Sequence, residues 1–225
     1  MSASIHVPES TRATAAAQPI ALPARRAVPR VRTTTAVRAI ELVLLVVAGG
    51  LLLVSTLFPY WGITLHAPQY PKGLRIEAYV YELTGDVSEV DGLNHYIGMM
   101  KLNDAAVMER QIARAAIALI AVLAVASFWL RGVWKALARL PIVIYPIVFA
   151  ADLFGWLYYA GHSLDPHAAL SSSIKPFTPR IMGVGHIGQF STEAAFMTGF
   201  VLAVVAAVIV LELSIMQWGT RRAER

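Results

Sequence analysis

Four long apolar blocks alternate with polar segments along the chain. The blocks cover residues 39–61, 112–130, 141–162 and 194–218. Each is close to the roughly 20 apolar residues that a helix needs to cross a hydrocarbon core of about 30 Å. Helices of soluble proteins typically run about 8–20 residues and carry capping signals. The pattern therefore predicts four transmembrane helices rather than one large soluble core.

The first apolar block has two interpretations, a cleaved signal peptide or a permanent span. A signal peptide has a shorter apolar core that ends at small residues before its cleavage site. The block at 39–61 is longer and ends in aromatic residues, Tyr60 and Trp61 among them, which is typical of a membrane interface. We therefore expect a span that is not cleaved.

The composition agrees with a membrane protein. Hydrophobic residues make up 57% of the chain and charged residues 15%, whereas a typical soluble domain has about 25% charged residues. The sequence has no cysteine, which excludes disulfides, zinc–thiolate sites, iron–sulfur clusters and cysteine nucleophiles. Any metal site must therefore use His, Met, Asp or Glu side chains.

Basic residues predict the orientation of the spans. They are concentrated in the first 36 residues, in the short connection with Arg131, Lys135 and Arg139, and at the C-terminus, 219–225. Four spans place these segments on one side, which the positive-inside rule assigns to the cytoplasm. The net charge of +5 is explained by this flanking, so we predict no nucleic-acid partner. We expect a multi-pass protein of the bacterial inner (cytoplasmic) membrane, surrounded by lipid, with both termini cytoplasmic.

The segments outside the blocks complete the expected architecture. Residues 1–36 are rich in Ala, Pro, Thr and Arg, and we expect a disordered cytoplasmic tail, with an organelle transit peptide as the alternative. Residues 62–111 and 163–193 form two outer loops with turn-forming Pro and Gly, and RIEAYVYEL in the first indicates a short strand or hairpin. The predicted fold class is an all-α membrane protein, a four-transmembrane-helix bundle over residues 37–218 with two structured extracytoplasmic loops.

Histidine is distributed unevenly along the sequence. Five of the six histidines lie in or beside the outer loops, namely His66, His95, His162, His167 and His186. If the chain is helical there, His95 and Met99 lie one turn apart on one face, with Met100 next to them. Imidazole and thioether ligands together suit copper. The alternative is that the histidines are interfacial or hydrogen-bonded and the methionines pack, since no tight motif such as HExxH is present.

Two acidic residues deserve separate consideration as functional candidates. Asp165 lies between His162 and His167 and can add an oxygen ligand to a metal site. Asp152 is near the middle of the third predicted span, where a charge is costly. We expect it to face the bundle interior, protonated or paired with the hydroxyl of Tyr145 or Tyr158. It is a candidate proton or ion relay, and the alternative is an interhelical hydrogen bond.

Four sequence segments carry a resemblance to a known family. They are HAPQYPKGL, LNHYIGMM, GHSLDP and PFTPRIMGVGHIGQF. They resemble an uncharacterised family of small bacterial polytopic membrane proteins associated with gene clusters for nitrous oxide reductase maturation and for copper and cytochrome c proteins. The resemblance covers about residues 40–205 and implies copper handling or support of a periplasmic redox enzyme. The matching positions of interest are His66, His95, Met99, His162 and Asp165.

Three functions follow from these patterns. The first is a membrane accessory protein that binds copper at its extracytoplasmic face and supports maturation of a periplasmic redox enzyme, in partnership with a copper or cytochrome c protein. Its metal ligands would be drawn from His66, His95, Met99, Met100, His162 and Asp165. The second is a docking or assembly subunit of a membrane redox complex without metal, and the third is a small transporter that uses Asp152. An enzyme is the least favoured class, because no nucleophile–base pair or cofactor motif is present.

Overall fold

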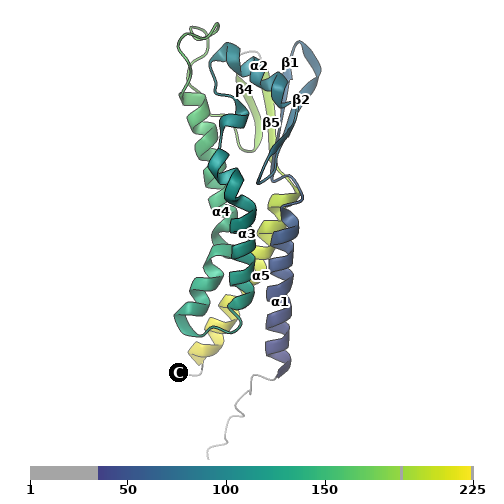
Figure 1. The fold of residues 1–225 in the computed structure, drawn as a ribbon, viewed down its shortest axis with the longest axis vertical. Coiled ribbons are helices and arrows are strands. Elements are labelled where there is room, and N and C mark those ends of the chain that lie inside the picture. Colours follow the sequence, from purple (N-terminus) through teal and green to yellow (C-terminus); the bar gives the residue numbers. More distant parts are fainter. Residues whose placement is uncertain (1–34, 188–189, 224–225) are drawn as a thin grey trace, which may run out of the picture. The chain divides into compact units, whose positions relative to one another are not determined.

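The computed structural model describes residues 35–187 and 190–223, and the expected tail up to residue 34 lies outside them. The described residues form four long helices that run side by side and a sheet with one further helix at one end of them (Figure 1). We call the first part the bundle and the second part the head. The long helices are α1 (Thr35–Ser55), α3 (Val107–Ala126), α4 (Gly132–His162) and α5 (Thr198–Ala223).

The four apolar blocks correspond to the four bundle helices. Among the described residues, three helices are long and apolar enough to cross a membrane, α1, α4 and most of α5. The helix α3 has 20 residues, but it carries three charged side chains in its first two turns, Glu109, Arg110 and Arg114. It packs against α1 and α4, so it belongs to the same bundle as the three apolar helices.

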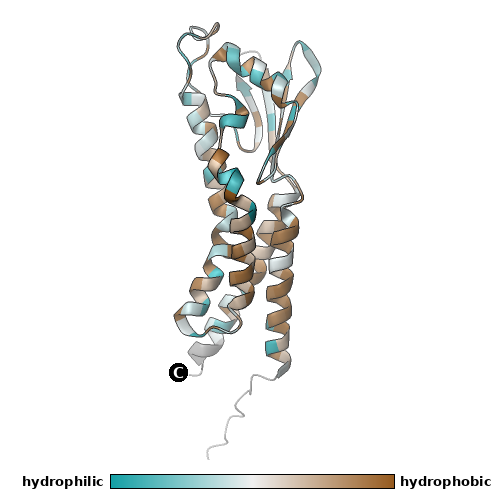
Figure 2. Ribbon diagram, in the orientation of Figure 1, coloured by the Kyte–Doolittle hydropathy of each residue, from teal (hydrophilic) through white to brown (hydrophobic). Residues whose placement is uncertain are grey.

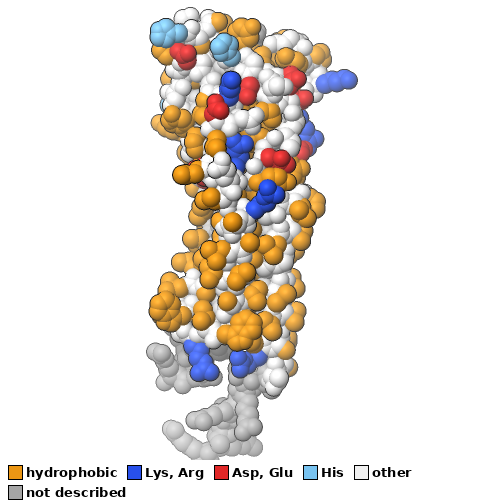
Figure 3. Space-filling view, in the orientation of Figure 1, with side chains coloured by type: hydrophobic (Ala, Val, Ile, Leu, Met, Phe, Trp, Pro, Cys, Tyr) orange, Lys and Arg blue, Asp and Glu red, His pale blue; other side chains and the backbone are white. Residues whose placement is uncertain are grey.

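The bundle helices are apolar both inside and outside. In α1 the buried positions Leu45, Ala48 and Leu52 recur at helical spacing and form one stripe. They join a core with small residues of α3 and α5, such as Ala121 and Ala206, which allow the helices to approach closely. Large apolar side chains on the opposite faces are exposed, the bundle helices are mainly hydrophobic along their length (Figure 2), and on the face shown in Figure 3 these side chains form an apolar belt. An apolar exterior of this kind fits lipid rather than water.

The prediction of an all-α class is wrong, because the head contains a five-stranded antiparallel sheet. The strands are β1 (Trp61–Ala67), β2 (Tyr70–Ala78), β3 (Leu83–Gly85), β4 (Gly183–Ile187) and β5 (Phe190–Phe196), in the order β3-β2-β1-β5-β4. The first three strands come almost wholly from the first predicted loop, β4 comes from the second, and β5 runs from the second loop into the fourth apolar block. Pairing of β1 with β5, from Trp61 opposite Phe196 to His66 opposite Ser191, joins the two loops into one sheet.

The inner face of the sheet is covered by α2 (Val87–Ile97) and a short 3-10 turn, Leu102–Asp104. Side chains alternate between the two faces of a strand. Leu74 and Ile76 of β2 therefore point the same way and form a small core with Val90 of α2. The opposite face is polar, and it carries the ion pair of Arg75 and Glu77 at 2.8 Å.

The head is joined to the bundle through a buried tyrosine. Tyr60 follows α1 and is completely buried, although the sequence suggested an aromatic belt at the lipid interface. Its hydroxyl lies 2.5 Å from the hydroxyl of Ser55, and its ring contacts those of Tyr145 and Phe149 on α4. A side chain on Gly199, at the start of α5, would collide with the Tyr60 ring. The absence of that side chain lets α5 begin directly beside the end of α1.

Candidate functional site

An apolar cavity of about 130 Å³ lies between the sheet and α2. Its walls come from the inner face of the sheet, from α2 and from the segment that follows α4. The principal lining side chains are Trp61, Ile63, Leu65, Leu74, Ile76, Val90, Leu93, Asn94, Ile97, Met99, Phe177, Pro179, Phe190 and Thr192. Leu157 of α4 also contributes, so the cavity extends towards the end of that helix.

The spacing of the lining residues explains why they meet. Alternate positions of β1, such as Ile63 and Leu65, face the same side of the sheet. Thr192 of β5 is the direct cross-strand partner of Leu65 and therefore shares that face. In α2, Val90 and Ile97 are two turns apart and present one apolar stripe to the sheet. The cavity is the space that remains between these two surfaces.

Two polar side chains are placed in this apolar surface. Thr192 is only 4% exposed, and its hydroxyl has no hydrogen-bond partner among the described residues. Asn94 is 7% exposed, and its side-chain amide has only a long contact of 3.5 Å to the Met100 carbonyl. A buried polar group without a partner costs about 1–3 kcal/mol. The Thr192 hydroxyl has almost no accessible surface and lies beside Gly185 of β4, so a ligand recovers that cost only where its polar atom displaces the groups that cover the hydroxyl.

Two of the predicted metal ligands, His95 and Met99, line a second and shallower cavity. The rest of its lining is Asp91, Gly92, Tyr96 and Lys101. The two residues are not stacked along one helix face, because α2 ends at Ile97 and Gly98 adopts the left-handed conformation with φ 80°. The chain turns there, and Met99 lines both this cavity and the apolar one.

The end of α2 is joined to the segment after α4. The backbone N–H of Asp165 donates to the Gly98 carbonyl at 2.8 Å, and the N–H of Leu170 donates to the Tyr96 carbonyl at 2.9 Å. A Cβ on Gly98 would lie 2.7 Å from the Asp165 carbonyl oxygen, so only glycine allows this approach. The NHYIGMM and GHSLDP segments are therefore neighbours in the folded protein.

Asp165 organises the turn that follows this junction. Its carboxylate accepts the backbone N–H of His167 at 2.8 Å and lies 3.3 Å from Nδ1 of the same residue. The hydrogen bond from the His167 backbone lowers the pKa of Asp165, and electrostatic interactions with the His167 and His95 side chains act in the same direction. Both Asp165 and His167 are exposed to solvent.

The other predicted ligands lie at different places. His66 is exposed on the outer face of the sheet, opposite Ser191, which also pairs with His186. The His162 ring stacks on Tyr158 with ring centroids 4.0 Å apart, and its Nδ1 lies 2.9 Å from the Tyr158 carbonyl. Met100 is half-buried beyond the end of α2.

The described residues therefore do not assemble the whole predicted ligand set. No three His, Asp or Glu side chains among them converge on a point that could hold a metal ion. Asp152, the predicted relay residue, is exposed on α4 rather than directed into the bundle. Tyr145, one of its expected partners, instead contacts Tyr60.

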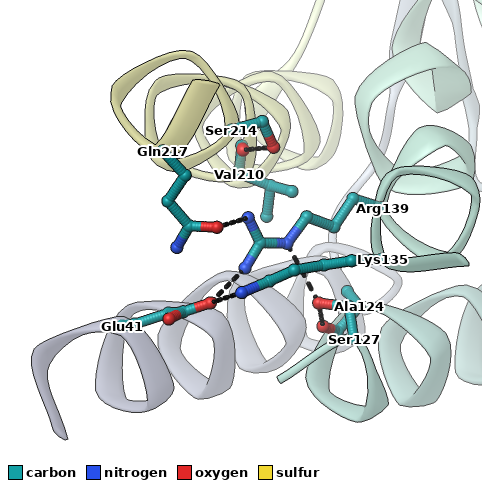
Figure 4. A network of polar contacts seen from close by, with 8 residues as sticks. All are labelled: Glu41, Ala124, Ser127, Lys135, Arg139, Val210, Ser214 and Gln217. Carbon is teal, nitrogen blue, oxygen red and sulfur yellow. Dashed lines mark hydrogen bonds and ion pairs between the residues drawn. The ribbon is translucent and has the colours of Figure 1, made fainter. Parts of the chain in front are cut away.

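A buried ion network at the other end of the bundle was missed by the sequence analysis (Figure 4). The Glu41 carboxylate oxygen Oε1 of α1 pairs with Lys135 Nζ at 2.5 Å and with a terminal nitrogen of Arg139 at 2.6 Å, both from α4. Arg139 also donates to Ser127 at 3.0 Å and to Gln217 of α5 at 3.2 Å. Lys135 and Arg139 are one helical turn apart, and this spacing could have indicated that they share an acidic partner. From the sequence, both residues were attributed to membrane orientation alone.

Comparison with known proteins gives no match at the level of families, curated proteins or solved structures.

Proposed function

We propose that the protein is a membrane-anchored binding protein whose head receives a small, mainly apolar ligand in the cavity between the sheet and α2. The observation that supports this most is the unpaired hydroxyl of Thr192 within a mainly apolar wall. Ligand sites in proteins are commonly apolar with a few polar groups that fix orientation. The three apolar helices supply the membrane anchor.

The size of the cavity limits the ligand. At about 130 Å³ it is similar to an engineered cavity of about 150 Å³ that remains dry and binds benzene. The occupant is therefore expected to be a single ring or a short alkyl group with one hydroxyl or carbonyl. That polar atom would pair with Thr192, and Asn94 offers a second partner. A larger molecule could place only part of itself in this space.

The test compares phenol with benzene on the full chain in detergent. We expect both compounds to raise the thermal stability of the wild type, with phenol binding more tightly because its hydroxyl pairs with Thr192. Thr192→Val keeps the shape of the side chain but removes the hydroxyl, so the preference for phenol should disappear while benzene still binds. Thr64→Val, on the opposite face of the sheet, is the matched control. Equal effects of the two variants, or no stabilisation by either compound, would contradict the proposal.

Copper binding at the end of α2 is a second candidate function. It is favoured by the common cavity of His95 and Met99 and by the junction that places the Asp165 segment beside it. Lys101 lines the same cavity, and its positive charge opposes a bound cation. The resemblance of these segments to the copper-associated family supports the same reading, with a periplasmic redox protein as the partner.

Copper content measured by mass spectrometry tests this second function. The wild type, loaded under reducing conditions, is expected to hold near-stoichiometric copper, and His95→Ala/Met99→Ala should lose it. His66→Ala, on the outer face of the sheet, is the control and should retain the metal. Retention of copper by the double variant would exclude this site.

A further inference from the structure

A third cavity lies where α3 leaves the head. It is lined by Tyr81, Asn103, Val107, Arg110, Gln111 and Arg114. Tyr81 belongs to the β2–β3 connection and packs against the core of the bundle. The remaining residues lie in the first turns of α3 or just before it. The cavity is therefore at the boundary between the head and the bundle.

Two arginines provide the charge of this cavity. Arg110 and Arg114 are four residues apart on α3, so their side chains share one face of the helix. The central guanidinium carbon of Arg114 lies 4.2 Å from the centre of the Tyr81 ring, and this cation–π contact helps to hold the guanidinium in place. Arg110 donates from one terminal nitrogen to the Asn103 carbonyl, whereas its buried Nε has no hydrogen-bond partner among the described residues. The lining thus carries two positive charges, and the unpaired Nε of Arg110 is buried behind it.

The position of the cavity relative to the apolar belt suggests the source of the ligand. Arg114 is the last charged residue of α3, and the rest of the helix to Ala126 is uncharged. Leu119 and Val122, further along the helix, are 59% and 63% exposed. Figure 3 shows Lys and Arg side chains on one face immediately above the apolar belt. A molecule bound at the arginines could lay an apolar chain along this part of α3.

We propose that this cavity binds the phosphodiester of an anionic phospholipid from the adjacent leaflet. Guanidinium groups match phosphate oxygens through paired hydrogen bonds, and Arg is preferred over Lys where that geometry matters. The Gln111 amide adds a neutral donor to the same lining. Glu82, whose charge acts on Tyr81, offsets part of the positive charge. A phosphodiester with one negative charge therefore suits the site better than a doubly charged free phosphate.

Native mass spectrometry of the full chain tests this proposal, with phosphatidylglycerol, phosphatidylcholine and inorganic phosphate as probes. We expect phosphatidylglycerol to bind the wild type, and each arginine replaced by glutamine to weaken binding roughly tenfold. Arg114→Gln alone is a useful variant because this side chain is exposed and its loss should not prevent folding. The control is Lys72→Gln/Arg75→Gln, which removes two exposed charges from the sheet.

The outcomes separate the possible ligands. Binding of phosphatidylglycerol that falls in Arg110→Gln/Arg114→Gln but not in the control supports the lipid site. Equal loss in the control would show general attraction between charges, and the proposed site would be rejected. Competition by inorganic phosphate at similar concentration would identify a soluble phosphate compound as the ligand and overturn the lipid assignment. Equal binding of phosphatidylcholine would overturn the preference for anionic lipid.

Discussion

Glu41 holds two cations inside the bundle, and its removal tests whether this network stabilises the protein. Lys135 and Arg139 approach the same carboxylate oxygen, and their side chains are only 12% and 3% exposed. Glu41→Gln keeps the size of the side chain but removes its charge. Both cations would then remain within the bundle without a counter-ion from Glu41. We therefore expect a large loss of stability rather than the small effect of a surface ion pair.

The magnitude follows from the burial of the three groups. At an effective dielectric of about 20, opposite charges separated by about 4 Å attract by roughly 4 kcal/mol. Desolvation and the repulsion between the two cations offset much of this attraction in the intact network. Breaking a buried pair by removing one partner costs about 3–5 kcal/mol, because the other charge is left uncompensated. For a chain of this size that corresponds to a fall in melting temperature of roughly 6–20 °C.

Thermal unfolding in detergent, followed by circular dichroism, measures this effect. Glu212→Gln is the matched control, because Glu212 is exposed on α5 and the chemical change is identical. A second variant, Glu41→Gln/Lys135→Gln, removes one cation together with the acid and should be more stable than Glu41→Gln alone. If Glu41→Gln is no worse than Glu212→Gln, or if the second change makes the protein still less stable, the assignment of the network as a stabilising unit is refuted.

Two further predictions concern the junction between α2 and the segment after α4. Gly98→Ala should weaken the junction by about 2–3 kcal/mol, because it combines a strained φ of 80° with a Cβ in collision with Asp165. Hydrogen exchange at the Asp165 and Leu170 amides should therefore become faster. Gly92→Ala, which places its Cβ in open space within α2, is the control and should stabilise the protein slightly, so equal effects of the two variants would contradict the reasoning. The pKa of Asp165 is lowered in the folded protein by the backbone hydrogen bond from His167, so its hold on that amide should be present at neutral pH and lost only in acid, as pH falls through the lowered pKa. Asp165→Asn should remove this pH dependence, and protection of the His167 amide that is independent of pH in the wild type would disprove it.

The four bundle helices and a short strand in the first outer loop could be predicted from the sequence, whereas the pairing of five strands into one sheet could not. Continuous apolar blocks give a strong local signal, and each of the four coincides with a bundle helix. The first block, however, includes Tyr60 and Trp61, which read as an interfacial belt but are buried where the chain enters β1. The strand β5 was not predicted, because residues 190–193 were assigned to the second outer loop and residues 194–196 to the fourth span. Its identity depends on pairing with β1, which is distant in sequence, and such pairing leaves little trace in a local pattern.

The candidate site was predictable only in part for the same reason. His95 and Met99 were singled out by residue type, and they do share a cavity. The apolar cavity was missed because residues such as Leu65 and Thr192 acquire a common face only when β1 and β5 pair. Residue chemistry can nominate ligands, but it cannot say which side chains a distant strand will bring opposite them.

The connection between the head and the bundle indicates which wall of the apolar cavity can move. The strand β1 follows α1 after a short connection, the strand β5 leads almost directly into α5, and these two helices pack along each other. Separating the central strands would therefore disturb the bundle as well. The helix α2 has no such anchor, and it is held at its end by the backbone hydrogen bonds to Asp165 and Leu170. Access of a ligand to the cavity is thus expected to require movement of α2 and its junction, while the sheet remains fixed on the membrane helices.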